Sequence, residues 1–180
     1  MGRIVIISGP PGAGKSTIAR ALTEQTAGPL GMHMHTDDLY AYIRKGFVEP
    51  WRPESQHQNI TLMRAMAASA GVCASQGYDV CVDGIVGTWF LDPWRDLARA
   101  QDLDLRFVVL LPAEDEVVAR ATARTAPGAM SDAAVVRQMW QAFQAYPPPP
   151  GHVVDTTARS AADTVAELSE RLALGDFMVK

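Results

Sequence analysis

The sequence predicts a single α/β domain over residues 1–180, in which five parallel strands form one sheet flanked by helices. Five short apolar runs alternate with segments whose apolar residues recur at helical spacing. Strands that alternate with helices form βαβ units, and right-handed crossovers make the strands of such units parallel. The length is sufficient for one substantial core. The chain contains no internal repeat and no low-complexity run.

The first strand leads into the most informative stretch of the chain. Residues 4–7 are continuously apolar, as in a buried parallel strand. Residues 9–17, Gly-Pro-Pro-Gly-Ala-Gly-Lys-Ser-Thr, match the pattern G-x-x-x-x-G-K-S/T, and residues 16–25 have helical spacing. Strand, glycine-rich turn, lysine, hydroxyl and helix together are the P-loop signature. A chance match at average composition is rare, roughly one per cent or less.

Each residue type of this motif suits a bound phosphate. Glycine permits the backbone conformations that turn amides inward, and the helix N-terminus adds the positive end of its dipole. Lys15 offers a cation to the β- and γ-phosphates, and Ser16 offers an oxygen to Mg²⁺. The simpler alternative is a glycine-rich turn that holds no ligand. We expect ATP and Mg²⁺ to bind here, with contacts from Gly9, Gly12, Ala13, Gly14, Lys15, Ser16 and Thr17.

The second strand is predicted at residues 31–35, with a helix or turn starting at Thr36. Asp37 and Asp38 follow the strand at the sheet edge where α/β proteins bind ligands. Asp37 is the stronger catalytic candidate and Asp38 the alternative, although helix capping would explain either residue. His33 and His35 alternate onto one face of the strand. They could belong to a metal site, but partly buried or hydrogen-bonded histidines explain them better.

Residues 40–53 form a short amphipathic piece and a loop, and residues 54–76 a long helix with the apolar stripe Ile60, Met63, Ala67, Ala70 and Ala74. The third strand, residues 78–83, ends in Asp83. An apolar strand that ends in aspartate is the Walker B pattern, whose carboxylate holds Mg²⁺ directly or through water. Contact between Asp83 and the phosphate acceptor is the rival interpretation.

Aromatic residues gather in the two segments after the second and third strands. Residues 84–91 are predicted to be a flexible loop, and Asp92 to cap a helix with proline at its first position. Because the carboxyl ends of parallel strands meet at one edge, the two segments could build the acceptor pocket; packing in a lid or core is an equal alternative. The aromatic residues are Tyr40, Tyr42, Phe47, Trp51, Trp89, Phe90 and Trp94.

The fourth strand is predicted at residues 105–111, followed by a helix that begins at Pro112. Arg120 and Arg124 share a face of this helix, next to an expected hinge at residues 125–130. The two guanidinium groups could clamp a phosphate or simply lie at a solvated helix end. Ser131 and Asp132 begin the next helix, whose predicted stripe is Val135, Met139 and Phe143.

The fifth strand, residues 152–154, precedes Asp155, Thr156 and Thr157. Ser160 and Asp163 form a capping-box-like start for the last helix, with Val165, Leu168 and Leu172 directed inward.

Charge and composition limit the classes of partner that we expect for this chain. The formal charge of −4 argues against a nucleic-acid or acidic-membrane partner. The chain shows neither a secretory leader nor a long apolar span, so we expect a cytoplasmic protein. No lysine follows an asparagine, so the guanine-reading motif N-K-x-D is absent and ATP is favoured over GTP. Cys73 and Cys81 form no metal or redox pattern.

With its motifs in these places, the chain resembles P-loop small-molecule kinases of the nucleoside-monophosphate-kinase type. Within that group it is most similar to chloramphenicol phosphotransferase-like proteins. The resemblance implies the strand order 2-3-1-4-5, a small lid at about residues 120–132 and acceptor-binding segments at about 38–53 and 84–94. It implies that Asp37 activates the acceptor, that Asp83 lies in the metal site, that Arg120 and Arg124 are lid arginines, and that residues 155–157 lie beside the nucleotide base.

We therefore expect an ATP-dependent phosphotransferase that moves the γ-phosphate to a hydroxyl of a small molecule, such as an antibiotic or another metabolite. Asp37 would be the general base, and Lys15, Arg120 and Arg124 would stabilise the transferred phosphoryl group. The alternatives are a kinase acting on a nucleotide, nucleotide-sugar or nucleic-acid end, and a nucleotide-binding regulator without transferase activity. The sequence leaves the oligomeric state open. The expected acceptor contacts are Asp37, Asp38, Tyr40, Trp51, Arg52, Asp83 and Trp89.

Overall fold

The computed structural model describes residues 2–125 and 130–179. Five parallel strands form one sheet in the order β2-β3-β1-β4-β5, which confirms the predicted fold class and strand order. The strands are β1 (Arg3–Ser8), β2 (Gly31–His35), β3 (Asp79–Gly84), β4 (Asp104–Leu110) and β5 (Val153–Val154). The α-helices are α1 (Lys15–Glu24), α2 (Asp37–Ala41), α3 (Gln56–Ser75), α4 (Asp92–Gln101), α5 (Glu114–Thr122), α6 (Ala133–Ala145) and α7 (Ala161–Ala173).

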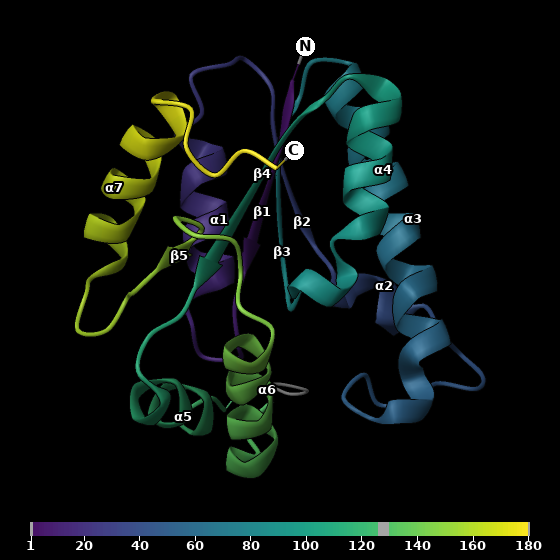
Figure 1. Cartoon of the computed structure of the whole chain (residues 1–180), viewed down its shortest axis with the longest axis vertical. Helices are drawn as coiled ribbons and strands as arrows, with labels where there is room; N and C mark the ends of the chain where they lie inside the picture. The colour runs from purple at the N-terminus through teal and green to yellow at the C-terminus, as the bar shows by residue number, and fades with distance from the viewer. Residues whose placement is uncertain (1, 126–129, 180) are drawn as a thin grey trace.

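The sheet is the middle of three layers. Helices α1 and α7 cover one face, and α3 and α4 cover the other (Figure 1). The alternation of side chains along β1 explains the division, since Ile4 and Ile6 pack with α3 and α4, whereas Val5 and Ile7 pack with α1 and α7. Because both faces are covered, the central strands are apolar on both sides.

Helices α5 and α6 lie beyond the carboxyl end of the sheet (Figure 1). They share a small apolar cluster of Val117, Ala121 and Val136. The indole Nε1 of Trp140 in α6 donates to the carbonyl of Pro112 at 2.9 Å, which ties α6 to the end of β4. The expected lid falls in this region. Its residues 126–129 lie outside the described residues.

Three local predictions differ from the structure. The segment 84–91, predicted to be flexible, contains a short 3₁₀ helix, η2 (Thr88–Phe90), and buries Val86 and Leu91 completely. Helix α4 does start at Asp92, but no side chain caps it, and the Asp92 carboxylate lies 3.3 Å from Arg95. In α6 the buried valine is Val136 in place of the predicted Val135.

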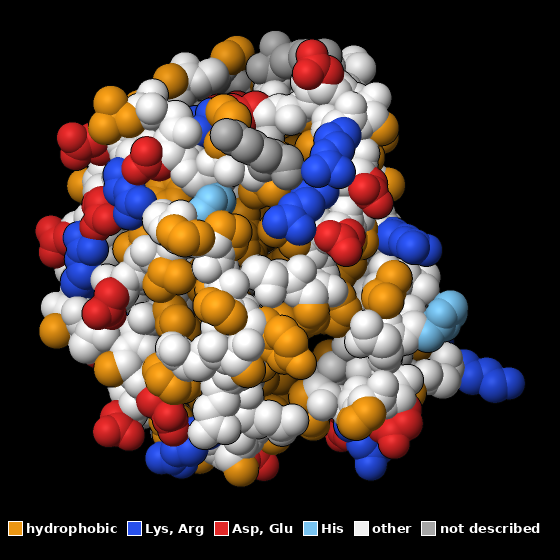
Figure 2. Space-filling model, viewed as in Figure 1, with side chains coloured by type: hydrophobic (Ala, Val, Ile, Leu, Met, Phe, Trp, Pro, Cys, Tyr) orange, Lys and Arg blue, Asp and Glu red, His pale blue; other side chains and the backbone are white. Residues whose placement is uncertain are grey.

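Charged side chains of both signs are interspersed around the face shown in Figure 2, with hydrophobic side chains in its hollowed centre. Over the described residues, no helix combines the length and the apolar character needed to cross a bilayer.

Candidate active site

The P-loop joins β1 to α1 as predicted. At two of its glycines the backbone has a positive φ and also leaves no space for a side chain: Gly9 has φ 144° and Gly12 has φ 88°. A Cβ on Gly9 would lie 2.3 Å from the carbonyl oxygen of Leu110, and a Cβ on Gly12 would lie 2.4 Å from that of Val117. The loop is therefore packed tightly against β4 and α5.

The N-terminus of α1 supplies donors for an anion. Gly14 is its N-cap residue, has the left-handed φ of 93° and provides no side-chain cap. The first amides of the helix, at Lys15, Ser16 and Thr17, consequently have no intrahelical or capping acceptor. This donor set fits a polyphosphate, because backbone amides and the helix dipole favour negative charge at this end.

The ammonium group of Lys15 lies at the centre of the site. Its Nζ donates to the carbonyl oxygen of Pro10 at 3.0 Å. Desolvation by burial lowers the pKa of Lys15 to about 8; the carboxylates of Asp83 and Asp37 oppose this shift, and Arg124 reinforces it. Lys15 is thus within electrostatic reach of both candidate aspartates and of one predicted lid arginine.

Asp83 is completely buried, and both of its carboxylate oxygens are occupied. Ser16 Oγ donates to Oδ2 at 2.6 Å, and Oδ1 lies 2.7 Å from His33 Nε2. His33 is hydrogen-bonded, as the simpler interpretation of the two histidines predicted. The hydrogen bond from Ser16 Oγ to Oδ2 fixes the orientation of the Ser16 hydroxyl. Asp83 does not line the cavity described below.

The two aspartates after β2 face different surroundings. Asp37 is the first residue of α2 and lines a cavity beside the P-loop. Its carboxylate is two-thirds exposed and lies 3.8 Å from His35 Nε2. Asp38 is 74% exposed, lies 3.7 Å from His35 Nδ1 and is outside the cavity lining. Of these two residues, Asp37 alone lines the cavity.

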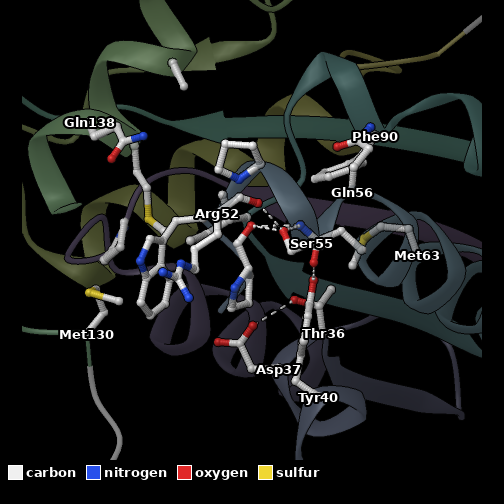
Figure 3. A pocket seen from close by; sticks show the side chains of 18 of the residues that line it. Thr36, Asp37, Tyr40, Arg52, Ser55, Gln56, Met63, Phe90, Met130 and Gln138 are labelled. Atoms are coloured by element: carbon white, nitrogen blue, oxygen red, sulfur yellow. Dashed lines mark hydrogen bonds between the residues drawn. The ribbon is translucent and has the colours of Figure 1, made fainter. Parts of the chain in front are cut away.

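The cavity has a volume of 770 Å³ and reaches the P-loop at Pro11. Figure 3 shows side chains from several elements converging on it. Four further predicted acceptor contacts line it, namely Tyr40, Trp51, Arg52 and Trp89. The rest of its wall is Thr36, Phe47, Pro50, Pro53, Ser55, Gln56, Asn59, Met63, Ile85, Phe90, Met130, Ser131, Asp132, Gln138, Met139 and Ala142.

Sequence reasoning missed the contributions of α3 and α6 to this wall. Asn59 is 4% exposed, and its Oδ1 accepts a hydrogen bond from the hydroxyl of Tyr40 at 2.9 Å. Burial and the charge of Asp37 raise the pKa of Tyr40 to about 12, so this hydroxyl keeps its proton. An asparagine on the otherwise apolar buried face of α3 was the available signal.

The two predicted lid arginines have different interaction partners. Arg120 pairs with Glu116 one turn earlier in α5, and its Nη2 lies 3.4 Å from the carbonyl oxygen of Thr156. Arg124 acts electrostatically on Lys15, which places its charge near the phosphate loop.

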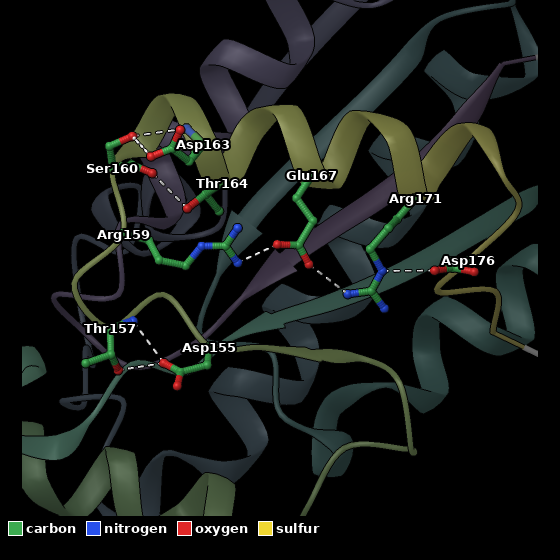
Figure 4. Close-up of polar contacts among 9 residues, drawn as sticks. All are labelled: Asp155, Thr157, Arg159, Ser160, Asp163, Thr164, Glu167, Arg171 and Asp176. Carbon is green, nitrogen blue, oxygen red and sulfur yellow. Dashed lines mark hydrogen bonds and ion pairs between the residues drawn. The ribbon is translucent and has the colours of Figure 1, made fainter.

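Residues 155–157 form a tight turn beside α5. The Asp155 carboxylate accepts from the amide and hydroxyl of Thr157 (Figure 4), and these hydrogen bonds lower its pKa. The Thr157 hydroxyl also accepts from the amide of Ala113 at 2.7 Å. Within the described part of the chain, the buried Thr156 hydroxyl has no hydrogen-bond partner.

The sheet order, the phosphate-binding loop and the adjoining cavity define a protein with the P-loop kinase fold. Residues 4–150 match the family described as an AAA domain, AAA_33, and the chain belongs to that family. A comparison with curated protein sequences finds no match.

Solved structures share the fold at low identity. A sugar kinase from Janibacter sp. HTCC2649 has a TM-score of 0.70 at 17% identity, with 96% of this chain and 95% of that chain covered. The tunicamycin resistance protein of Deinococcus radiodurans has a TM-score of 0.66 at 15% identity, covering 100% and 99%. A gluconokinase from Sinorhizobium meliloti 1021 has a TM-score of 0.59 at 22% identity, covering 97% of each chain.

Proposed function

We propose that the protein is an ATP-dependent kinase that transfers the γ-phosphate to a hydroxyl of a small molecule bound in the cavity. The observation that carries this proposal is that the phosphate loop adjoins the cavity. Pro11 of the phosphate loop and Asp37 both line the 770 Å³ cavity, and the Asp37 carboxylate influences Lys15 electrostatically. A cavity of this size suits a small molecule. The structurally similar sugar kinase and gluconokinase support an acceptor of this kind.

The residues of the loop would bind the triphosphate. The amides at the start of α1 and the Lys15 ammonium match the charge of the β- and γ-phosphates. A bound Mg²⁺ would neutralise part of the phosphate charge. Ser16 would hold the ion, and Asp83 would orient the Ser16 hydroxyl through its 2.6 Å hydrogen bond.

Asp37 would act on the acceptor. Its exposed carboxylate at the cavity wall can accept a hydrogen bond from an alcohol and take its proton. As the alcohol oxygen bonds to the γ-phosphorus, the bond from that phosphorus to the oxygen of ADP breaks, and the proton goes to Asp37. Lys15 and Arg124 would stabilise the negative charge on the transferred group. Arg120 and residues 155–157 would lie toward the adenosine part of the nucleotide.

The test is alcohol-dependent release of ADP by the purified chain with Mg²⁺ and ATP. We expect nucleotide binding that depends on Mg²⁺ and ADP release that at least one alcohol stimulates. A phosphorylated alcohol, detected by mass spectrometry, would complete the evidence. Binding of ATP without stimulation by any alcohol, across neutral, acidic and polyhydroxylated compounds, would overturn the proposal in favour of a nucleotide-binding regulator.

A further inference from the structure

We propose that the acceptor is an uncharged alcohol with a bulky apolar body, preferably an aromatic one. This inference rests on the proposed kinase function and deepens it by naming the class of substrate. Three properties of the cavity carry it: its apolar wall, the small number of cationic groups on that wall, and the hydrogen bonding of several of its polar side chains to the protein itself.

The wall is predominantly apolar and aromatic. The ring of Trp89 is held in place by contacts with three other rings, at centroid distances of 6.2 Å to Phe90, 5.4 Å to Phe143 and 5.8 Å to Tyr146. A ring fixed in this way offers a flat surface at little entropic cost. The other apolar lining residues are Pro11, Phe47, Pro50, Trp51, Pro53, Met63, Ile85, Met130, Met139 and Ala142.

The charges on the wall do not favour an anion. Of the described lining residues, Arg52 alone is cationic; its side chain is 60% exposed and lies 3.6 Å from Glu49. Asp37 and Asp132 place two carboxylates on the same wall. An anionic acceptor would therefore lose hydration without gaining an ion pair, which is costly for a charge.

Several polar groups of the wall already have partners. The Tyr40 hydroxyl donates to Asn59, whose Nδ2 donates to the carbonyl oxygen of Pro50 at 2.8 Å and to Ser55 Oγ at 2.8 Å. Ser55 Oγ lies within hydrogen-bond distance of the carbonyl oxygens of Pro50 and Arg52, and its one hydrogen can be donated to either. The Asp132 carboxylate caps α6 by accepting from two backbone amides. These groups are engaged within the protein and so offer little to the hydroxyls of a polyhydroxylated sugar, and each hydroxyl buried without a partner carries a cost.

The first experiment compares matched alcohols. The probes are 3-phenyl-1-propanol, its ring carboxylate 4-(3-hydroxypropyl)benzoate, D-gluconate and D-glucose. Binding is followed by quenching of tryptophan fluorescence in the presence of Mg²⁺ and a non-hydrolysable ATP analogue, because Trp51 and Trp89 line the cavity. Turnover is followed by ADP release. We expect 3-phenyl-1-propanol to exceed each of the other three by about tenfold or more in both affinity and kcat/KM.

A second experiment changes the charge of the wall. Gln138 is exposed on α6, and its side chain is drawn in the cavity wall in Figure 3. Gln138→Arg should shift the preference between the two phenyl alcohols toward the carboxylate by roughly tenfold. Gln144→Arg is the matched control, since Gln144 is exposed on the same helix and outside the lining. The control should leave the ratio unchanged.

The outcomes separate this inference from the kinase function. Equal or better use of the carboxylate, gluconate or glucose by the unmodified chain would overturn the inference and leave the kinase intact. Tight binding of the neutral alcohol without ADP release would support the selectivity of the cavity and count against the kinase. An unchanged preference in Gln138→Arg would show that wall charge does not select the acceptor, which also overturns the inference.

Discussion

Replacing Asp37 by asparagine tests the proposed chemistry most directly. Asparagine keeps the size and a hydrogen-bond acceptor but cannot take a proton. We expect phosphate transfer to fall by about two to four powers of ten, equivalent to roughly 3–5 kcal/mol of transition-state stabilisation. Because the Asp37 side chain is 67% exposed and begins a short helix, the change should alter the free energy of unfolding by only about 0.5 kcal/mol.

Nucleotide affinity should survive this substitution at pH 7. The Asp37 carboxylate raises the pKa of Lys15, so its removal lowers that pKa somewhat below its value of about 8. Burial remains the main cause of the shift, and Lys15 stays protonated in most molecules at neutral pH. The expected signature is therefore a large loss in kcat with a small change in the dissociation constant of ATP.

The assay is single-turnover ADP release at saturating nucleotide and acceptor, with ATP binding and thermal unfolding measured on the same preparations. Asp38→Asn is the matched control, since Asp38 is similarly exposed, is adjacent in sequence and does not line the cavity. The control should retain activity within a factor of about two. Full activity in Asp37→Asn would refute the reasoning, and a loss confined to Asp38→Asn would transfer the catalytic role to that residue.

Four further predictions concern the phosphate loop and the groups behind it. Lys15→Ala should abolish both nucleotide affinity and transfer, whereas the exposed Lys45→Ala should affect neither. Because phosphates favour the charged form of Lys15, ATP affinity should fall as the pH rises above about 8; a flat titration between pH 7 and 9.5 would contradict this. His33→Ala removes a partner of the buried carboxylate that holds the P-loop serine, so it should cost roughly 1–3 kcal/mol of stability in denaturant unfolding and raise the Mg²⁺ concentration needed for half-maximal activity; unchanged values for both would count against it. Gly9→Ala should destabilise the fold by roughly 2–3 kcal/mol through its positive φ and overlap with β4, while Gly28→Ala, with no contact closer than 3.9 Å, should leave the melting temperature nearly unchanged.

Much of the fold follows from local sequence because its signals are local. An apolar run such as residues 4–7 can be satisfied only by burial on both faces, and a glycine-rich turn with a lysine at a helix start specifies a phosphate loop within a few residues. The predicted inward positions Val165, Leu168 and Leu172 of α7 are buried for the same reason. Predictions were less accurate for segments whose burial depends on contacts with residues distant in the sequence. Segment 84–91 has the sequence of a loop, yet Val86 is buried, and its backbone amide and carbonyl are hydrogen-bonded to the Ser8 hydroxyl at the end of β1.

The segment after α7 is a second case in which local sequence could not predict a contact. Residues after α7 return to the sheet, where Met178 forms an antiparallel bridge with Arg106 and the amide of Phe107 donates to the carbonyl of Phe177. Three or four residues carry too little periodicity to predict such a contact. The contact exists because the edge of β4 offers free backbone groups at that level of the sheet.

The sequence alone determined the phosphate loop, the parallel sheet and the position of Asp37 at its carboxyl edge, since each depends on residues close together in the chain. The tertiary structure decided which aspartate faces the cavity, that His33 and Ser16 share the Asp83 carboxylate, and that α3 and α6 complete the acceptor wall. These features join residues dozens of positions apart. Side-chain direction and burial at contacts between such distant residues depend on how whole helices pack on the sheet, and no local pattern encodes that packing.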